Sequence, residues 1–298
     1  MASVKKGFLI VLLAASLVFS SGCIEFGGGS EEETGQGLKI TSFESIPSEV
    51  FSGDSFDLLL DVKNVGGVTA EDVQAEITQK SGATEGDLDT TTTINLDPPS
   101  QDFEGEMHTF DAEMNAPEIS VGPENLDIKS RVYYKYNTNA RVLLPVMMKD
   151  EYKERSRAGD EIPSMGVSRV SDGPFSVSID GASPTLVEDK SGAKDFRFYI
   201  EGKNKGKGVP YHTDGHASPD SDDLHDINVS IDLPDNVDWI NDEDCSGDVT
   251  VRDGDDFQVI CEANYTGDSD FEEIPIDVDL DYGYYIDDQT SVKVQEEI

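Results

Sequence analysis

The chain has 298 residues, and its 62 Asp and Glu outnumber its 22 Lys and Arg to give a formal net charge of −40 at pH 7. We expect no nucleic-acid partner, because binding phosphates requires a concentration of Lys and Arg. Hydrophobic residues make up 36% of the chain and recur in alternating runs, so the sequence is not that of a disordered polypeptide.

The acidic residues run through both halves of the chain instead of forming one block. So much like charge disfavours a compact state in dilute buffer. At molar salt the Debye length falls to about 3 Å, which largely removes the repulsion between exposed carboxylates. The composition therefore favours a protein of a salt-loving microbe, for which a halophilic archaeon is our first expectation. The alternative is an acidic surface built for a basic partner.

Residues 1–22 have the layout of a secretion signal. Lys5 and Lys6 precede a run of apolar and small residues from Gly7 to Phe19, and small residues continue up to Cys23. Thirteen residues of helix span roughly 20 Å, which is short of the roughly 30 Å hydrocarbon layer of a membrane. We therefore expect a signal peptide and not a lasting transmembrane helix.

The stretch Ser20–Cys23 resembles the lipobox of bacterial and archaeal lipoproteins, although Ser20 departs from the usual Leu. The resemblance implies that the thiol of Cys23 carries a lipid and that the protein stays at the extracellular face of the cell membrane. An ordinary cleaved signal with an incidental Cys is the alternative. Residues 23–37 are rich in Gly, Ser and Glu, which predicts a flexible tether behind the lipid anchor.

The remaining chain is predicted to be a duplicated module, with domain 1 over residues 38–148, a linker over 149–173 and domain 2 over 174–298. Each half contains, in the same order, two strands around an Asn-Gly turn, an acidic loop, a Tyr-rich strand and a closing strand. The turns are Lys63–Gly66 and Lys203–Gly206. The strands are expected at 56–62, 73–77, 128–136 and 140–146 in the first half and at 175–179, 196–200, 227–233, 276–285 and 291–294 in the second.

The strand predictions rest on alternation with a period of two. From Ile276 to Tyr282 every second residue is apolar and every residue between is Asp, as in a strand with one buried and one wet face. Turn residues separate such strands at intervals of about a dozen residues, which is typical of an antiparallel sandwich. The predicted fold class is all-β, with two antiparallel immunoglobulin-like β-sandwich domains in tandem. Helix is expected only around residues 150–158, within the linker.

One segment of the first half resembles a known family. Phe43, Ile46 and Pro47, followed by Val50–Asp54 and by a strand that ends in Lys63–Gly66, are similar to the CARDB and S-layer-associated immunoglobulin-like modules of archaeal and bacterial surface proteins. The resemblance implies a sandwich that binds or spaces partners at a cell surface and implies no reaction. The second half departs from the pattern, with Ala182–Pro184 at the corresponding entry and a long insertion after Gly208.

Once Cys23 is assigned to the lipid, Cys245 and Cys261 remain as an even pair in a compartment that tolerates disulfides. A hairpin from Val249 to Ile260, turning around Asp253 and Gly254, would bring the two cysteines together. A closed loop of this length contributes about 3 kcal/mol to the free energy of unfolding in the chain-entropy model. Two free thiols are the alternative.

His212, His216 and His225 lie in one stretch that is also rich in Asp. Imidazole and carboxylate groups together can hold a transition metal, so these three residues are candidate metal ligands. Gly215 and Pro219 argue against the helix that would place His212 and His216 on one face, and a solvated loop is the alternative. Residues 235–244 are rich in Asp as well, but they do not match a calcium-binding loop.

Asn228 and Asn264 each begin an Asn-x-Ser/Thr triplet and are candidate glycosylation sites in an exported protein. The sequence holds no Gly-x-Ser-x-Gly, no His-Glu-x-x-His and no phosphate loop, so we expect neither enzymatic activity nor a cofactor. The expected function is non-catalytic binding, adhesion or spacing at the cell envelope, with other envelope proteins or a surface ligand as partners. The alternative is a metal-binding or metal-dependent surface protein that uses the loop 212–226.

Overall fold

The computed structural model describes residues 37–84, 86, 88, 93–188, 194–213, 219–241 and 245–296. By its internal contacts the chain divides into residues 1–33 and 34–298, and all described residues belong to the second unit. The predicted signal, Cys23 and all but the last residue of the predicted tether lie outside the described part. No helix in the described part is long and apolar enough to cross a membrane.

Strands make up nearly all of the regular structure, in agreement with the all-β prediction. The first half contains β1 (Leu38–Ile46), β2 (Glu49–Phe51), β3 (Ser55–Asn64), β4 (Ala70–Gln79), β5 (Ile94–Leu96), β6 (Met107–Asn115) and β7 (Glu124–Met148). The second half contains α1 (Lys149–Ala158), β8 (Gly166–Val170), β9 (Phe175–Gly181), β10 (Thr185–Val187), β11 (Asp195–Asn204), β12 (Val209–Tyr211), β13 (Asp226–Asp232), β14 (Val237–Trp239), β15 (Gly247–Thr250), β16 (Asp256–Tyr265) and β17 (Phe271–Gln295).

The alternation of apolar and polar residues produces these strands as expected. Along β17, Ile276, Val278 and Leu280 are fully buried, while the intervening Asp277 and Asp279 are only partly covered. Burying every second side chain removes apolar surface from water and leaves the carboxylates hydrated, which a strand achieves and a helix does not. Strands β3, β4, β9, β11 and β13 contain the segments that the same pattern predicted, apart from single residues at their ends.

The Tyr-rich and closing strands were predicted as separate elements, and this prediction is wrong in both halves. Each pair is one continuous strand of 25 residues, β7 in the first half and β17 in the second. Residues 137–139 separate the two predicted strands of the first half. In the structure Thr138 in their centre is fully buried and its hydroxyl lies 2.7 Å from that of Tyr282, so the strand continues through it.

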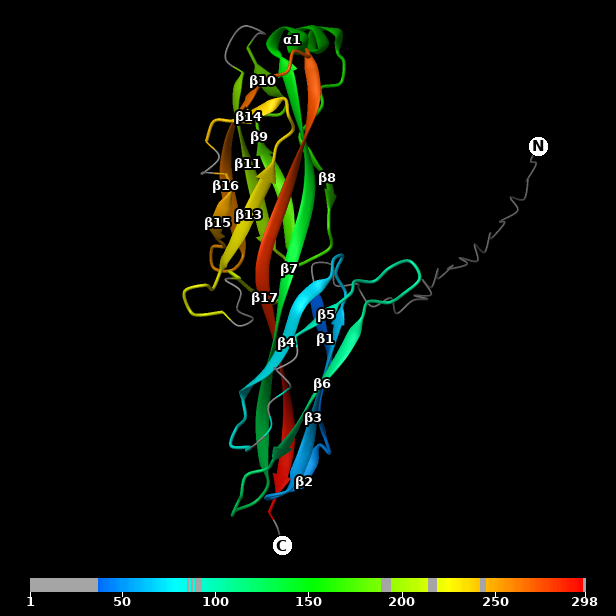
Figure 1. The fold of residues 1–298 in the computed structure, drawn as a ribbon, viewed down its shortest axis with the longest axis vertical. Coiled ribbons are helices and arrows are strands. Elements are labelled where there is room, and N and C mark those ends of the chain that lie inside the picture. Colours follow the sequence, from blue (N-terminus) through cyan, green and yellow to red (C-terminus); the bar gives the residue numbers. More distant parts are fainter. Residues whose placement is uncertain are drawn as a thin grey trace, which may run out of the picture. The chain divides into compact units, whose positions relative to one another are not determined.

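The two long strands pair with each other in antiparallel register, from Phe271 opposite Met147 to Val294 opposite Glu124. At the usual rise of a strand, 25 residues correspond to about 80 Å. Figure 1 shows β7 and β17 running side by side through the described part of the chain. The pairing joins the last strand of each half to the other half.

Three sheets are built around this pair. The longest has the order β15-β13-β17-β7-β4-β5, and β2, β8, β10 and β12 pair with β7 or β17 beside this path. The two smaller sheets are β1-β3-β6 and β14-β16-β11-β9, one from each half. Figure 1 shows the first beside the N-terminal part of β7 and the second beside its C-terminal part. Buried side chains of all three sheets form one hydrophobic cluster.

The two predicted Asn-Gly turns have the same hydrogen bonds in both halves. The amide nitrogen of Asn64 donates to the carbonyl of Val68, and its oxygen accepts from the backbone of Gly66. The same bonds join Asn204 to Gly208 and Gly206. Each asparagine therefore closes the turn that follows β3 or β11.

The predicted linker is folded. It contains α1, which covers the helical turn expected at 150–158 and ends at Gly159 in the left-handed conformation with φ 77°. It also contains β8, which pairs with Ala140–Leu143 of β7. Because β7 and β17 pair across the proposed boundary, the division into domains over 38–148 and 174–298 remains a prediction.

The predicted hairpin around Asp253 and Gly254 is also different in the structure. The turn exists, and the backbone amide of Gly254 donates to Val251 at 3.2 Å. However, β15 pairs with β13, whereas β16 pairs with β11 and β14. The segment therefore connects two sheets instead of forming one hairpin, because alternation alone does not identify the partner of a strand.

Candidate binding site at the centre of the paired strands

A tyrosine cluster occupies the core side of β7 and β17 at their centre. Tyr134 lies opposite Tyr284 and Tyr136 opposite Tyr282, with ring centroids 5.7 and 6.2 Å apart. Burial raises the pKa of Tyr134 and Tyr282 well above the ordinary value, and it raises the pKa of Tyr284 to about 12. The rings are therefore neutral at physiological pH.

The hydroxyls of this cluster hold the loops of the two halves. The Tyr136 hydroxyl accepts from the backbone of Gly67 at 3.0 Å and donates to the carbonyl of Asp172 at 2.9 Å. The Tyr284 hydroxyl accepts from the backbone of Gly208 at 3.0 Å. Buried tyrosine hydroxyls need hydrogen-bond partners, and these bonds to the loops stabilise the fold. The sequence indicated the Tyr-rich strands but not that they meet.

A polar hollow of about 430 Å³ lies at the same level of the strands. This volume is within the range of about 300–1,000 Å³ that small-molecule sites have. Its wall contains Lys135, which is paired with Asp72 at 2.7 Å, and Asn137, which donates to Asp281. Cationic, amide and carboxylate groups are mixed in this wall. The hollow is lined by Val68, Thr69, Glu71, Lys135, Tyr136, Asn137, Asn139, Thr213, Asp281 and Tyr282.

Sequence reasoning did not find this hollow. Its lining comes from the turn between β3 and β4, from β4, β7 and β17, and from the segment after β12, most of which are far apart in the chain. None of these residues belongs to a recognisable motif, and only the pairing of β7 with β17 brings them together. It is a candidate site for a small polar group.

A row of aspartate side chains lies along β17, beyond the hollow. The Arg141 guanidinium donates to both carboxylate oxygens of Asp277 at 2.7 Å and lowers the pKa of that residue. Burial and the neighbouring charges of Asp281, Asp232 and Asp277 raise the pKa of Asp279. Two acids on one strand therefore titrate differently.

The candidate metal ligands lie around the insertion after β12. His212 lies beside Asp248, with 3.5 Å between Nδ1 of His212 and Oδ1 of Asp248. His225 has a left-handed backbone, with φ 70°, just before β13. Backbone bonds from His212 to Asp223 and from His225 to Pro210 place both residues at the base of the same loop.

His216 lies outside the described residues. Among the residues that the structure describes, no group of three or more His, Cys, Asp or Glu is placed to hold a metal ion. Metal binding by His212, His216 and His225 remains a prediction.

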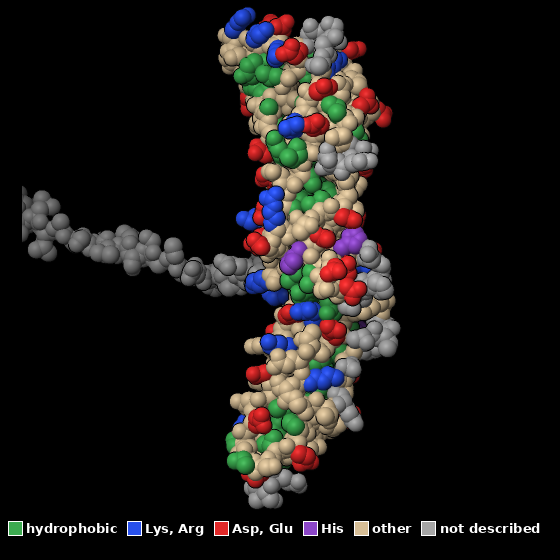
Figure 2. Space-filling model, turned by 90° about the vertical axis from the view of Figure 1, so that its left-hand side faces the viewer, with side chains coloured by type: hydrophobic (Ala, Val, Ile, Leu, Met, Phe, Trp, Pro, Cys, Tyr) green, Lys and Arg blue, Asp and Glu red, His purple; other side chains and the backbone are tan. Residues whose placement is uncertain are grey.

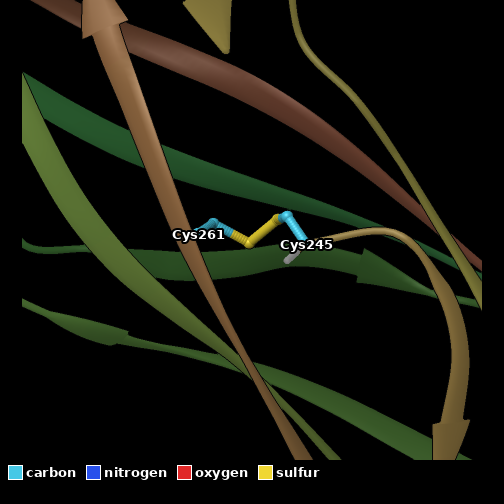
Figure 3. The surroundings of a disulfide bond; sticks show 2 residues. All are labelled: Cys245 and Cys261. Atoms are coloured by element: carbon cyan, nitrogen blue, oxygen red, sulfur yellow. A yellow bond between two sulfur atoms is a disulfide. The ribbon is translucent and has the colours of Figure 1, made fainter. Parts of the chain in front are cut away.

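The predicted disulfide between Cys245 and Cys261 is confirmed, with 4.9 Å between the two Cα atoms. Figure 3 shows Cys261 on its strand and Cys245 on the loop beside it. Cys245 precedes β15 and Cys261 belongs to β16, so the bond links the long sheet to the smaller sheet of the second half. Both side chains are fully buried.

The candidate glycosylation residues lie within paired strands. Asn264 belongs to β16, between β11 and β14, and its amide donates to Asp195. Asn228 belongs to β13, between β15 and β17, and its amide donates to Asp248 at 3.0 Å. Both side chains are half-buried. Modification at either position remains a prediction.

Comparison with known proteins identifies no family. No family model matches the chain, and no curated protein matches it. Among solved structures, the collagen adhesin of S. aureus aligns over 88% of this chain and 93% of its own length, with 9% identity and a TM-score of 0.12. A likeness at this level carries no argument about fold or function.

Proposed function

We propose that this chain is an exported lipoprotein, held at the outer face of a membrane through Cys23, that acts as a non-catalytic binding, adhesion or spacer module of the cell envelope. The leader sequence and the lipobox-like residues before Cys23 support the location. The predicted tether behind Cys23 supports a folded unit that stands off the lipid surface. The acidic composition supports a high-salt habitat, and a halophilic archaeon is the source we propose.

The observation that favours a spacer is the pairing of β7 with β17. Two 25-residue strands tie the halves together along their whole length, and a buried hydroxyl pair, Thr138 with Tyr282, lies at the centre. Cross-strand ion pairs join Arg131 to Asp287 and Arg141 to Asp277 on either side of it. A structure without a flexible joint between its halves keeps a fixed span, which is what a spacer requires.

We also propose that the two halves are immunoglobulin-like sandwiches, each completed by part of the other half's long strand. In the first half, β2 pairs with the end of β17, and in the second half β10 pairs with the end of β7. The duplicated order of strands and the two equivalent Asn turns support this interpretation.

The location is tested by lipid labelling in a host that processes lipoproteins. We expect label on the wild-type chain and none on Cys23→Ser, which should also leave the membrane fraction. An unmodified thiol at position 23 in the native protein would refute the anchor.

The spacer role is tested by the distance between the halves. Spin labels at Glu113→Cys and Ser178→Cys, in a Cys23→Ser background, sit on exposed positions of β6 and β9. Double electron–electron resonance in molar KCl should give one narrow distance distribution. A broad distribution, as for two domains on a flexible linker, would rule out the fixed span.

A further inference from the structure

The loop Asp97–Glu106 between β5 and β6 carries the most exposed aromatic side chain among the described residues. Phe103 is 76% exposed, and Met107, directly after the loop, is 56% exposed. Pro99 in the same loop is exposed as well. Figure 1 shows this loop projecting from the sheets between β5 and β6. It therefore presents apolar surface to its surroundings.

The loop is ordered despite its exposure. The backbone amide of Glu106 donates to Asp97 at 2.9 Å, and that of Ser100 donates to Phe103 at 2.9 Å. Lys63 pairs with Glu104 at 2.6 Å. Phe103 is thus held in place before any contact is made, so binding loses little conformational entropy.

The fold does not require this projection. In the second half the equivalent connection, from β15 to β16, is the short turn Val251–Asp255, closed by the bond from Gly254 to Val251. The ten residues Asp97–Glu106 replace these five in the first half. Joining two strands therefore does not explain the extra length of the loop Asp97–Glu106 or its apolar tip.

The base of the loop lies close to Gly37, from which the chain continues toward Cys23. The carbonyl of Gly37, the first described residue, accepts from the backbone of Val65 at 2.9 Å. The preceding residue Asn64 donates from its backbone to Glu106 at 2.9 Å. A Cβ on Gly105 would lie 1.8 Å from the backbone carbonyl oxygen of Asn64, so only glycine permits this contact between the loop and β3.

From this placement we propose that Phe103, with Pro99 and Met107, forms a second contact with the membrane beside the lipid of Cys23. The inference rests on the proposed lipid anchor. Residues 23–36 reach at most about 50 Å when fully extended, so the tether keeps the loop near the lipid surface at high effective concentration. One lipid chain alone binds only marginally, and a second contact makes anchoring durable.

The charges of the loop and its base make the proposed contact depend on salt. Lys39 and Lys63 are cross-strand neighbours on β1 and β3, next to the exit of the chain. Lys63 is already paired with Glu104, and the loop itself carries Asp97, Asp102, Glu104 and Glu106, so the loop and its base are acidic overall. Figure 2 shows Lys and Arg side chains interspersed with Asp and Glu on one face of the described part. Asp102 next to Phe103 repels phosphates, so the contact should be strongest at high salt.

The test uses the chain from residue 24 with an N-terminal hexahistidine in place of the lipid, held on phosphatidylcholine vesicles by a nickel-chelating lipid in molar KCl. Trp239 is the single tryptophan and is replaced by Phe. A new tryptophan is introduced by Phe103→Trp or, as a matched control, by Val121→Trp in an exposed loop elsewhere. Brominated phosphatidylcholine quenches tryptophan that enters the bilayer.

We expect the fluorescence of Phe103→Trp to shift to the blue and to be lost with brominated lipid, while that of Val121→Trp stays unchanged. Equal quenching of both variants, or of neither, would overturn the proposal. Because the tag imposes attachment, these results do not depend on lipidation of Cys23.

Discussion

Asp277 and Asp279 lie two residues apart on β17, yet their surroundings move their pKa values in opposite directions. Arg141 donates to both oxygens of Asp277 and lowers its pKa, whereas burial and three neighbouring aspartates raise the pKa of Asp279. The chain has 62 acidic residues, and its composition gives only their total charge, not the pKa of each one. The contribution of each acid to stability depends on what its neighbour strand places beside it.

We expect Asp279→Asn to raise the free energy of unfolding at neutral pH and low salt by roughly 0.5 kcal/mol, as for one like-charge pair on adjacent strands. Because the pKa of Asp279 is raised, the native state holds this proton to higher pH than the unfolded state, and the carboxyl opposes folding as pH rises through its folded pKa. The gain should vanish below the ordinary pKa of Asp and shrink in molar KCl. Urea unfolding at several pH values measures it.

The control is Asp277→Asn on the same strand. The pKa of Asp277 is lowered, so its stabilisation is present above the unfolded pKa and is lost as pH falls through the folded one. This variant should therefore lower stability at neutral pH. Equal effects of the two substitutions would contradict the assignment.

The tyrosines at the centre of β7 and β17 give a second prediction at this scale. Burial raises the pKa of Tyr284 to about 12 and that of Tyr134 and Tyr282 above the ordinary value, so their stabilisation is complete below pH 10 and is lost as pH rises through the folded values. In an absorbance titration, these three rings should ionise only above the ordinary pKa of tyrosine and together with unfolding. Ionisation of all 10 tyrosines in one step near the ordinary pKa would contradict their burial.

At the scale of elements, alternation located most strands, but it did not give their length or their partners. Residues 137–139 lie between two predicted strands and are near the centre of the longest pairing in the structure. The turn after β3 is a contrary case, because Asn64 and the glycine two residues later identified it without any tertiary information. Local hydrogen bonds can be inferred from neighbours in sequence, and cross-strand pairs cannot.

We expect Asn64→Ala to destabilise the chain by about 2 kcal/mol, because it removes the hydrogen bonds that the Asn64 amide donates to the part-buried carbonyl of Val68 and to the buried carbonyl of Leu96. Chemical unfolding in molar KCl measures the change. The exposed residue Asn125 on β7 provides the control, since Asn125→Ala should stay within about 0.5 kcal/mol of wild type. Similar effects at both positions would show that the turn is not a determinant of stability.

At the scale of the whole molecule, the shared strands make the halves interdependent. Unfolding the second half removes β17, which pairs with β7 and β2 in the first. Buried residues of both halves belong to one cluster. We therefore expect residues 37–296 to unfold as one cooperative unit in spite of their duplicated sequence.

Replacing both Cys245 and Cys261 by Ala tests this cooperativity. Opening a loop with a sequence separation of 16 should lower the free energy of unfolding by about 3 kcal/mol. Fluorescence of Trp239 reports on the second half, and an exchange-protected amide of Leu60 on β3 reports on the first. Both transitions should move together. A shift confined to the second half would mean that the two halves fold separately.

The sequence alone determined the all-β character, the disulfide partners and the two Asn turns. These depend on the period of burial, on the number of cysteines available and on bonds between near neighbours. Only the tertiary structure decided that the last strand of each half pairs with the other, and hence where the polar hollow and the projecting Phe103 loop lie. Pairing between distant strands depends on the packing of whole faces, and no single stretch of residues carries that information.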